Sequence, residues 1–366
     1  VALSATPASA SSPADYNLLT TLLGVPANAA SPVALSFQVA IVDDAIDEAN
    51  ETFTLGFGAV SGTGALSATG TQLVTIIDDD LAGVTVTQSG GSTNVTEGGA
   101  TDTYTLVLSS QPTANVVITL NSGTQLTTAP NSVSFTSANW NTPQAVTVTA
   151  VDDAIAEGNH SGAITHTVSS TDAVYNGIGV ANVVVNISDN DVPGVTVTPT
   201  AGLVTTEAGG TASFTVVLNT QPMADVTIGL TSSDTTEGTV SPSSLTFTAA
   251  NWNTARTVTA TGVDDAIVDG DVAYTIVTAA ATSSDAAYTG VNAADVSVSN
   301  TDNDEAGVIL AESGGTTAVA EGGATDTYTL VLSSQPTANV VVAVNPNAQL
   351  TTAPTSVTFT PANWNV

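Results

Sequence analysis

The stretch NVVVNISDNDVPGVTV at residues 182–197 joins two hydrophobic segments through a short acidic one. Valine, isoleucine and threonine dominate on both sides, a composition that is typical of β-strands. Asp189 and Asp191 lie between the two segments, and Pro193 and Gly194 directly precede the second. Because this leaves almost no room for a linker, the stretch predicts that one β-domain ends and another begins within it.

The same junction recurs along the chain. IIDDDLAGVTV at 76–86 repeats it one period earlier, and SNTDNDEAGVIL at 299–310 repeats it one period later. A second marker, NWN, centres on the equally spaced Trp140, Trp252 and Trp364, and VDDAI also occurs three times at a closely similar interval. Self-similarity at a fixed period indicates tandem domains.

The markers divide the chain into four predicted repeats. Residues 83–192 and 193–305 are complete repeats, whereas 1–82 lacks the first strands and 306–366 lacks the last strands. Each complete repeat has about seven short runs rich in β-forming residues, separated by Gly, Pro, Asn and Ser clusters. This pattern predicts an all-β fold of tandem immunoglobulin-like Greek-key β-sandwiches in an elongated array.

The charge balance excludes several classes of partner. The 366 residues include 33 Asp and Glu but a single basic side chain, Arg256, which gives a net charge of −32. Such a surface repels nucleic acid and anionic lipid. The absence of cysteine excludes disulfides and thiolate metal sites. No apolar run is long enough for a membrane-spanning helix, so no membrane insertion is expected in this segment.

The acidic residues follow the predicted strands instead of being scattered. In the second repeat they fall in the turn after the first strand, after the strand AVTVTAV, and at the end of the last strand, where Greek-key strand ends can meet at one pole. Carboxylates about 4 Å apart repel by about 1 kcal/mol even in water, and no Lys or Arg is near to neutralise them. A cluster with only oxygen ligands suits Ca²⁺, which takes 6–8 oxygens.

Three segments of the first repeat carry a family resemblance. ADYNLL at 14–19, VDDAIDEANETFTLGF at 42–57 and VTIIDDD at 74–80 resemble the Calx-β domain, a calcium-binding β-sandwich of sodium/calcium exchangers and bacterial adhesins. The resemblance implies calcium ligands from an early Glu, an Asp-Tyr position, the Asp-Asp pair with the acids beyond it, and the closing Asp triplet.

Carried over residue by residue, the resemblance implies a calcium ligand set in each repeat. The sets are, for the first repeat, Asp15, Asp43, Asp44, Glu48, Glu51, Asp78, Asp79 and Asp80; for the second, Glu97, Asp152, Asp153, Glu157, Asp189 and Asp191; for the third, Glu207, Asp264, Asp265, Asp269, Asp302 and Asp304; and for the fourth, Glu321.

The complete repeats depart from the family pattern at three points. His160 stands where the first repeat has Glu51, Asn190 and Asn303 replace the middle Asp of the triplet, and neither complete repeat has a clear equivalent of Asp15. Fewer carboxylates imply fewer calcium ions or weaker binding.

Other readings of the acidic segments stay open. An EF-hand does not fit, because Pro193 takes a ligand position before Gly194. Cadherin repeats also bind calcium at acidic linkers, although NWN and VDDAI have no place in them. A calcium-dependent carbohydrate- or ligand-binding sandwich would need exposed aromatic side chains, whereas the three Trp share one position of the repeat. Because no Ser/His/Asp set recurs, we expect no enzyme.

These observations favour a structural role. We expect a calcium-rigidified repeat segment of a secreted or cell-surface bacterial protein, either the stalk of an adhesin or an extracellular filament. The expected partners are the neighbouring repeats and, in a filament or matrix, identical chains that pair through exposed strand edges. Calcium affinities of about 10⁻⁴–10⁻³ M suffice outside a cell.

Overall fold

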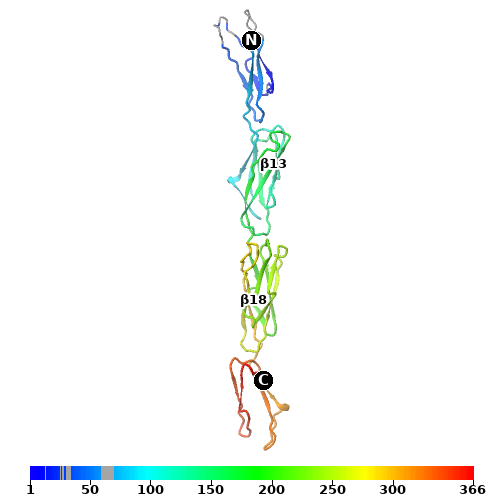
Figure 1. Cartoon of the computed structure of the whole chain (residues 1–366), viewed down its shortest axis with the longest axis vertical. Helices are drawn as coiled ribbons and strands as arrows, with labels where there is room; N and C mark the ends of the chain where they lie inside the picture. The colour runs from blue at the N-terminus through cyan, green and yellow to red at the C-terminus, as the bar shows by residue number, and fades with distance from the viewer. Residues whose placement is uncertain (13, 25, 27–28, 30–33, 59–69) are drawn as a thin grey trace. The chain divides into compact units, whose positions relative to one another are not determined.

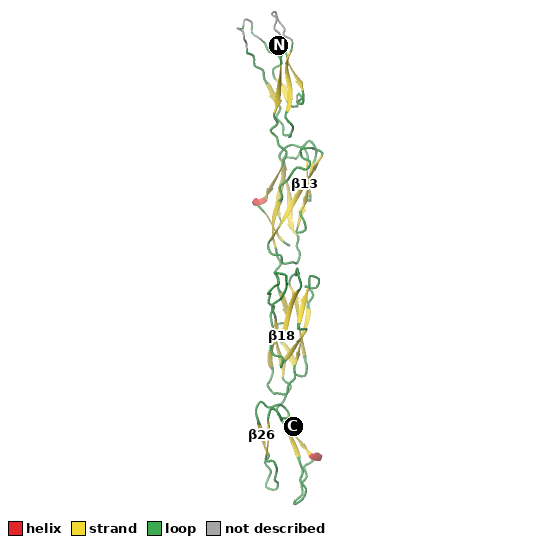
Figure 2. Ribbon diagram, viewed as in Figure 1, coloured by secondary structure: helices red, strands yellow, loops and turns green. Residues whose placement is uncertain are grey.

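A computed structural model describes the chain except for residues 13, 25, 27–28, 30–33 and 59–69. The prediction of an all-β protein built of tandem sandwiches is confirmed, and Figure 2 shows that strands and loops make up nearly all of the described residues. The chain forms two units, Val1–Asp153 with Gly158–Asn190, and Ala154–Glu157 with Asp191–Val366, each described by itself. The four repeat boundaries stay predictions.

The second repeat is a sandwich of two sheets. Its four-stranded sheet has the order β10-β12-β8-β6 and its five-stranded sheet the order β11-β9-β13-β14-β7. Pairing is antiparallel except between β7 and β14. The bounds are β6 Val84–Gln88, β7 Thr93–Thr96, β8 Asp102–Leu108, β9 Val116–Asn121, β10 Leu126–Ala129, β11 Ser132–Phe135, β12 Gln144–Ala150, β13 His160–Ser170 and β14 Val183–Ser188.

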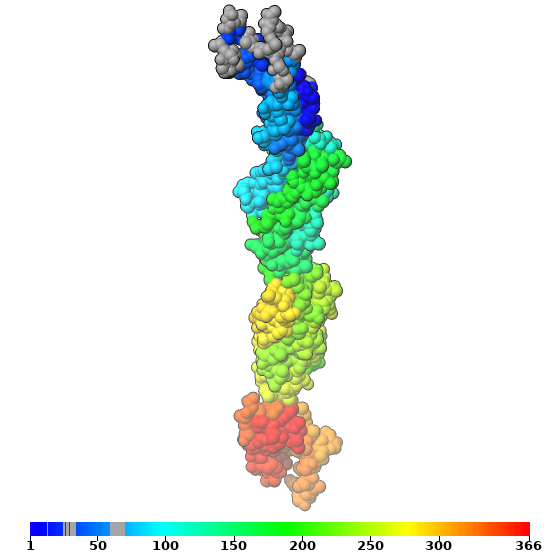
Figure 3. Space-filling model, turned by 45° about the horizontal axis from the view of Figure 1, so that its top comes forward, coloured from blue at the N-terminus to red at the C-terminus, as the bar shows by residue number. Residues whose placement is uncertain are grey.

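The third repeat has the same topology, with sheets β15-β17-β21-β19 and β16-β23-β22-β18-β20. Figure 1 labels β13 and β18 in the two sandwiches, and Figure 3 shows one outer face of the chain with its atoms drawn as spheres. The bounds are β15 Val195–Thr198, β16 Leu203–Thr206, β17 Thr211–Leu218, β18 Val226–Ser232, β19 Gly238–Ser241, β20 Ser244–Phe247, β21 Arg256–Gly262, β22 Val272–Thr278 and β23 Val296–Thr301.

The expected number of about seven strands per repeat was too low. In the second repeat the first hydrophobic run splits at the short helix η1 (Ser89–Gly91), so that β6 joins one sheet and β7 the other. A turn divides β10 from β11 in the same way. Composition shows a strand-forming run, but which sheet each half joins depends on its partners.

Alternating side chains of both sheets form each core. In β9, Val116 and Ile118 are fully buried, and Phe135 of β11 joins them. Burying such a side chain stabilises the fold by about 1.5–3 kcal/mol. Trp140 packs half-buried against this core. Asn139 holds the turn before it, since its Oδ1 accepts the Thr136 N–H at 2.6 Å. The NWN motif is therefore a structural turn.

The first and fourth repeats contain smaller sheets. The first combines β1-β4-β5 with the pair β2-β3, and the fourth has the pairs β24-β25 and β26-β27. Neither η1 nor the other described helix, η2 (Ser313–Gly315), has the length and apolar character to cross a membrane. The strand bounds are β1 Leu3–Pro7, β2 Tyr16–Leu18, β3 Val39–Ile41, β4 Glu51–Phe57, β5 Thr71–Ile76, β24 Val308–Glu312, β25 Tyr328–Leu332, β26 Val340–Ala343 and β27 Ser356–Phe359.

The two complete repeats fill one core position in opposite ways. In the second, Leu126 of β10 faces Gly162 of β13, where an added Cβ would lie 2.7 Å from the Leu126 Cδ1. In the third, Gly238 of β19 faces Tyr274 of β22, and a Cβ on Gly238 would lie 2.2 Å from the tyrosine ring. Each repeat thus pairs one large side chain with one glycine.

This size exchange predicts a rescue. Gly238→Leu should cost the third repeat about 1–3 kcal/mol, because the core has no room beside Tyr274. Adding Tyr274→Gly, which recreates the pairing of the second repeat, should cost less than the sum of the single changes in a double-mutant cycle measured by chemical denaturation. The control, Gly238→Leu with Ala273→Gly on the exposed face, should show no rescue. Additive costs in both pairs would contradict the steric account.

Candidate metal centre

The first repeat gathers all eight of its predicted ligands around one cavity. The cavity has a volume of about 220 Å³, and its lining comes from the loop before β2, the segment between β3 and β4, and the end of β5. Ligand atoms of Asp15, Glu48 and Glu51 lie within 4.8 Å of one another. The full acidic lining is Asp15, Asp43, Asp44, Glu48, Glu51, Asp78, Asp79 and Asp80.

The carboxylates of this cavity are held in place and repel one another. Asp78 accepts the backbone N–H of Glu48 at 2.9 Å, and Asp44 accepts that of Ile46 at 2.9 Å. Desolvation, with the nearby charges of Asp44 and Asp15, raises the pKa of Glu48. The raised pKa indicates that the ionised cluster is unfavourable unless a cation enters it.

The third repeat brings together acids that lie far apart in the sequence. Ligand atoms of Glu207, after β16, and of Asp302 and Asp304, after β23, lie within 4.8 Å of one another. These segments meet because β16 and β23 pair in parallel. Asp302 is fixed by the backbone N–H groups of Gly270 at 2.8 Å and Asp304 at 2.7 Å.

Two oxygens in this cluster are suited to a hard cation. Glu207 is buried, with 3% of its surface exposed, and burial raises the pKa of its carboxyl. Asp304 Oδ2 is buried and has no hydrogen-bond partner among the described residues. A buried carboxylate oxygen is costly without a proton or a cation. The donor set therefore fits Ca²⁺, which binds oxygen ligands in variable number.

The asparagines of the triplets act as donors. Asn303 Nδ2 donates to Asp264 Oδ1 at 3.1 Å, and Asn190 Nδ2 donates to Asp152 Oδ1 at 3.0 Å. Asn190 also reaches the Glu97 carbonyl at 3.0 Å. An aspartate at this position would add repulsion, whereas the amide links the Asp-Asp pair to the triplet. The substitution thus changes both charge and connectivity.

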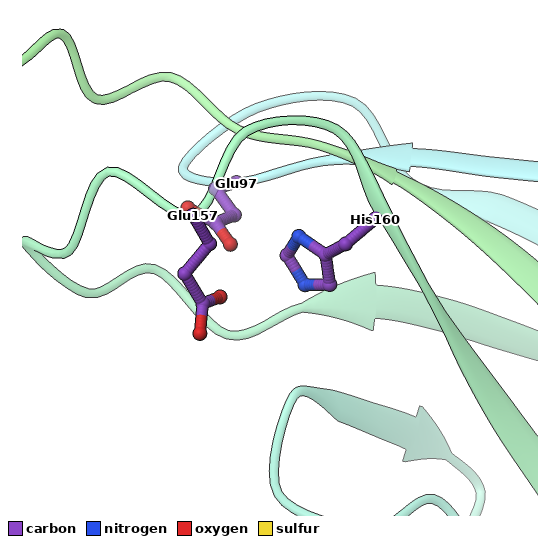
Figure 4. Close-up of side chains that lie close together, drawn as sticks. All are labelled: Glu97, Glu157 and His160. Atoms are coloured by element: carbon purple, nitrogen blue, oxygen red, sulfur yellow. The ribbon is translucent and has the colours of Figure 1, made fainter. Parts of the chain in front are cut away.

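The second repeat repeats this local geometry. Asp189 accepts the Gly158 N–H at 2.6 Å, as Asp302 does from Gly270 in the third repeat. Figure 4 shows the side chains of Glu97, after β7, and His160, at the start of β13, together with Glu157. Glu157 and Asp191 belong to the second unit, whereas Glu97, Asp152, Asp153 and Asp189 belong to the first.

One candidate ligand in the third repeat was missed from the sequence. Glu237, directly before β19, lies with Asp265 and Asp269 within 4.8 Å and is 6% exposed. Its carbonyl accepts the Val263 N–H at 3.0 Å, as the Asp15 carbonyl accepts that of Val42. Glu237 is thus the equivalent of Asp15.

The corresponding residue of the second repeat is Gln125, whose carbonyl accepts the Val151 N–H at 2.9 Å. An alignment on VDDAI and NWN, extended to Leu126 and Gly238, could have identified this position. The spacing from Asp15 to Val42 differs from that in the complete repeats, which concealed the equivalence in the sequence.

The strand register also identifies equivalent residues at the first positions of β4, β13 and β22. Glu51 pairs with Ile76, His160 with Ile187, and Val272 with Asn300, in each case two residues before the first Asp of the triplet. This supports the alignment of His160 with Glu51 and places an apolar residue there in the third repeat. Glu321 of the fourth repeat is exposed and belongs to none of the acidic groups found among the described residues.

The raised pKa values predict an unusual pH dependence. Desolvation, followed by neighbouring carboxylates, raises the pKa of Glu48 and Asp304 above their ordinary values, and burial does the same for Glu207. Such groups bind protons more readily in the folded chain, so stability grows as pH falls through the raised pKa. Hydrogen bonds from the backbone N–H groups of Asp304 and Gly270 lower the pKa of Asp302. The stability that ionised Asp302 contributes is therefore lost only when the pH falls below the ordinary pKa of 3.8.

In chelator, the melting temperature should therefore rise as the pH is lowered from 7 to about 4.5. In saturating calcium it should fall over the same range, because protons compete with the cation for the carboxylates. Calorimetric scans at several pH values would check both slopes. If the melting temperature in chelator also decreased as the pH was lowered, the proposed repulsion among the carboxylates would be contradicted.

The family model of the Calx-beta domain matches residues 1–80 and 188–304, more than half of the chain. No curated protein matches.

Several solved structures are similar at low identity. CBD12 from CALX1.2 is 12% identical, with 58% of this chain and 98% of that chain covered and a TM-score of 0.29. The calcium binding domain CBD12 of CALX1.1 is 16% identical, with 54% and 80% covered and a TM-score of 0.27. Domains 4 and 5 of the S-layer protein SbsC are 20% identical, with 42% and 69% covered and a TM-score of 0.24.

The family match spans the two repeats whose carboxylates form the clusters around Asp15 and Glu207. The chain therefore belongs to the Calx-beta domain family.

Proposed function

We propose that this chain is a calcium-rigidified structural segment of a secreted or cell-surface bacterial protein, serving as an adhesin stalk or as an extracellular filament. The observation that carries the proposal is the cavity of the first repeat, where eight carboxylates meet without a basic side chain in the lining. The recurrence of an acidic cluster at the corresponding strand ends of the third repeat supports it.

Calcium would be held by residues that tie distant segments together. In the third repeat, Glu207 follows β16, Asp264 and Asp265 follow β21, and Asp302 and Asp304 follow β23. A bound Ca²⁺ would supply positive charge among these carboxylates and stabilise the end of the sandwich. Ligand binding to the folded state alone raises stability in proportion to the logarithm of ligand concentration.

The position of the acids in the chain supports a structural role. The triplet residue Asp304 is followed within four residues by β24 of the next repeat. A cation fixed there restrains the last residues before the next sandwich. Extracellular calcium, present at high concentration, would keep such sites filled even at modest affinity.

Calcium removal should loosen the segment. Titration calorimetry of the whole chain should detect calcium binding, and excess EDTA should lower the melting temperature by several degrees, because about 1 kcal/mol shifts the melting point of a domain of this size by about 4–8 °C. Small-angle scattering should show a changed maximum dimension in EDTA. A Mg²⁺ titration serves as the control for simple charge screening. No heat of calcium binding and no effect of EDTA would overturn the proposal.

Single carboxylate variants test the ligand assignment. Glu207→Gln and Glu237→Gln should each weaken calcium binding to the third repeat at least about tenfold. In EDTA the same variants should be more stable than the parent, because repulsion is reduced. Asp225→Asn, an exposed residue of the same repeat outside the clusters, is the matched control and should change neither property. Weaker stability in EDTA for Glu207→Gln would indicate a purely structural role.

A further inference from the structure

The third repeat contains a chain of buried polar side chains that runs from its core to its acidic end. The hydroxyl oxygens of Tyr274, on β22, and Thr205, on β16, lie 3.1 Å apart. The Thr205 hydroxyl donates to Asn300 Oδ1 at 2.9 Å, and Asn300 Nδ2, on β23, donates to Glu237 Oε2 at 3.4 Å. All four side chains are buried, so these hydrogen bonds are made away from solvent.

The direction of the hydrogen bonds along this chain is fixed at its acidic end. Asn300 Nδ2 also donates to the Val263 carbonyl at 3.1 Å. Because a carbonyl and an ionised carboxylate can only accept, the amide nitrogen must face Val263 and Glu237, and the amide oxygen must face Thr205. The Thr205 proton is then directed at Asn300, so Tyr274 donates its own proton to Thr205 Oγ1. The donors thus all point towards the Glu237 carboxylate.

The other repeats have apolar side chains at the central positions of this chain. In the second repeat, β7 and β14 pair Val95 with Ile187, as β16 and β23 pair Thr205 with Asn300 in the third. The first repeat has Ile76 at the Asn300 position. Because burying polar groups costs free energy unless they are bonded, the polar residues of the third repeat need a reason other than core packing.

Two glycines make room for the polar chain. A Cβ on Gly262 would overlap Asn300 Oδ1, and a Cβ on Gly238 would overlap the Tyr274 ring. The second repeat has Ala150 at the Gly262 position, as the matching pairs β10-β12 and β19-β21 show. The third repeat therefore departs from the second both in its polar side chains and in the glycines that accommodate them.

The polar chain ends at an acidic cluster. Ligand atoms of Glu237, Asp265 and Asp269 lie within 4.8 Å of one another. The Val263 N–H donates to the Glu237 carbonyl at 3.0 Å, and the Val263 carbonyl accepts from Asn300. Asn300 therefore holds both the Glu237 side chain and the backbone that leads into the Asp-Asp pair. A hydrogen bond donated to a carboxylate favours its charged form, which is the form that binds a cation.

We propose that Asn300, Thr205 and Tyr274 are positioning residues, which hold the Glu237 carboxylate ionised and directed at the acidic cluster of the third repeat. This role rests on the proposed function, because the cation that Glu237 would bind there is calcium. Loss of the hydrogen-bond partners that orient a metal ligand typically weakens metal binding about tenfold to a hundredfold.

The residues equivalent to Glu237 in the other repeats have different surroundings. In the first repeat, Asp15 accepts hydrogen bonds from the backbone N–H and the hydroxyl of Ser11, only four residues earlier. In the second repeat the position is Gln125, whose side chain has no charge. Positioning by a polar chain through the core is thus a property of the third repeat, and the effect of removing it should be confined to that repeat.

Calcium titration of the full chain, followed by NMR, tests the proposal repeat by repeat. The Ile267 N–H, bonded to Asp265, reports on the third repeat, and the Ile46 N–H, bonded to Asp44, reports on the first. Asn300→Ile should raise the calcium concentration at the Ile267 midpoint at least about tenfold and leave the Ile46 midpoint unchanged. An unchanged Ile267 midpoint would overturn the positioning role alone. A parent chain in which neither amide responds to calcium would overturn the proposed function, and the positioning role with it.

A double-mutant cycle tests whether Asn300 acts through Glu237. Once Glu237→Gln has removed the carboxylate, adding Asn300→Ile should weaken calcium binding by less than about twofold further. Glu207→Gln is the matched control, because Glu207 belongs to another acidic group of the same repeat, and its effect should add to that of Asn300→Ile. Full additivity with Glu237→Gln as well would mean that Asn300 only supports the fold, and would overturn the positioning role.

The hydroxyl of Thr205 can be removed with little change in the shape of the side chain. Thr205→Val takes away the donor to Asn300 Oδ1 and the acceptor of the Tyr274 hydroxyl, and it should weaken calcium binding to the third repeat about threefold. Thr205→Ser keeps the hydroxyl and should restore most of the affinity. Equal affinities of the valine and serine variants would overturn the part of the proposal that includes Thr205 and Tyr274.

A combined variant keeps the test decisive if a single change destabilises the repeat. Thr205→Val, Tyr274→Phe and Asn300→Ile together introduce the types of side chain that the other repeats have at these positions. Because the whole polar set is replaced, no unpaired polar partner is left buried, and the variant should fold, as chemical denaturation in EDTA would check. Its calcium binding to the third repeat should still be about tenfold weaker than that of the parent. Parental affinity in this folded variant would overturn the proposal.

Discussion

Repulsion among carboxylates at the ends of the strands is the constraint on which the rest of this structure depends. Eight acidic side chains line one cavity of the first repeat, and the whole chain has one basic side chain, Arg256, to oppose them. Backbone N–H groups bonded to Asp78 and Asp302 offset part of the cost. Desolvation first, and then neighbouring carboxylates, raise the pKa of Glu48, and burial raises the pKa of Glu207. Under the proposed function, a bound cation would offset the repulsion that remains at the ends of the sandwiches.

The sandwich topology is what creates that constraint. Because β16 and β23 run parallel side by side, the residues that follow them, Glu207 and Asp302, reach the same place. The Asp-Asp pair arrives from β21 in the opposite sheet, and Asn303 links it to the triplet. Three segments from two sheets thus meet at one site, so occupation of that site bears on how the sheets are held together.

Not every acidic residue serves this site. Asp172 and Asp285 are buried as deeply as several core side chains, yet each accepts a backbone N–H, that of Thr113 or Met223, from the loop that follows β8 or β17. The repeat therefore uses carboxylates in two ways: as an acidic cluster at one end, where calcium binding is proposed, and as fully bonded anchors at the other.

The regular period of the repeats, the β-forming composition and the recurrence of acids after strands were enough to predict all-β sandwiches with acidic strand ends, because these features are local or repeat along the chain. The individual ligands of the first repeat were implied only by its resemblance to the Calx-β domain. The tertiary structure alone decided that the first hydrophobic run divides between two sheets and that Glu237 takes the position of Asp15. It also decided that Asn190 and Asn303 act as donors and that Asn300 is bonded to Glu237. Each of these depends on partners far away in the sequence, and only the pairing of strands brings such partners together.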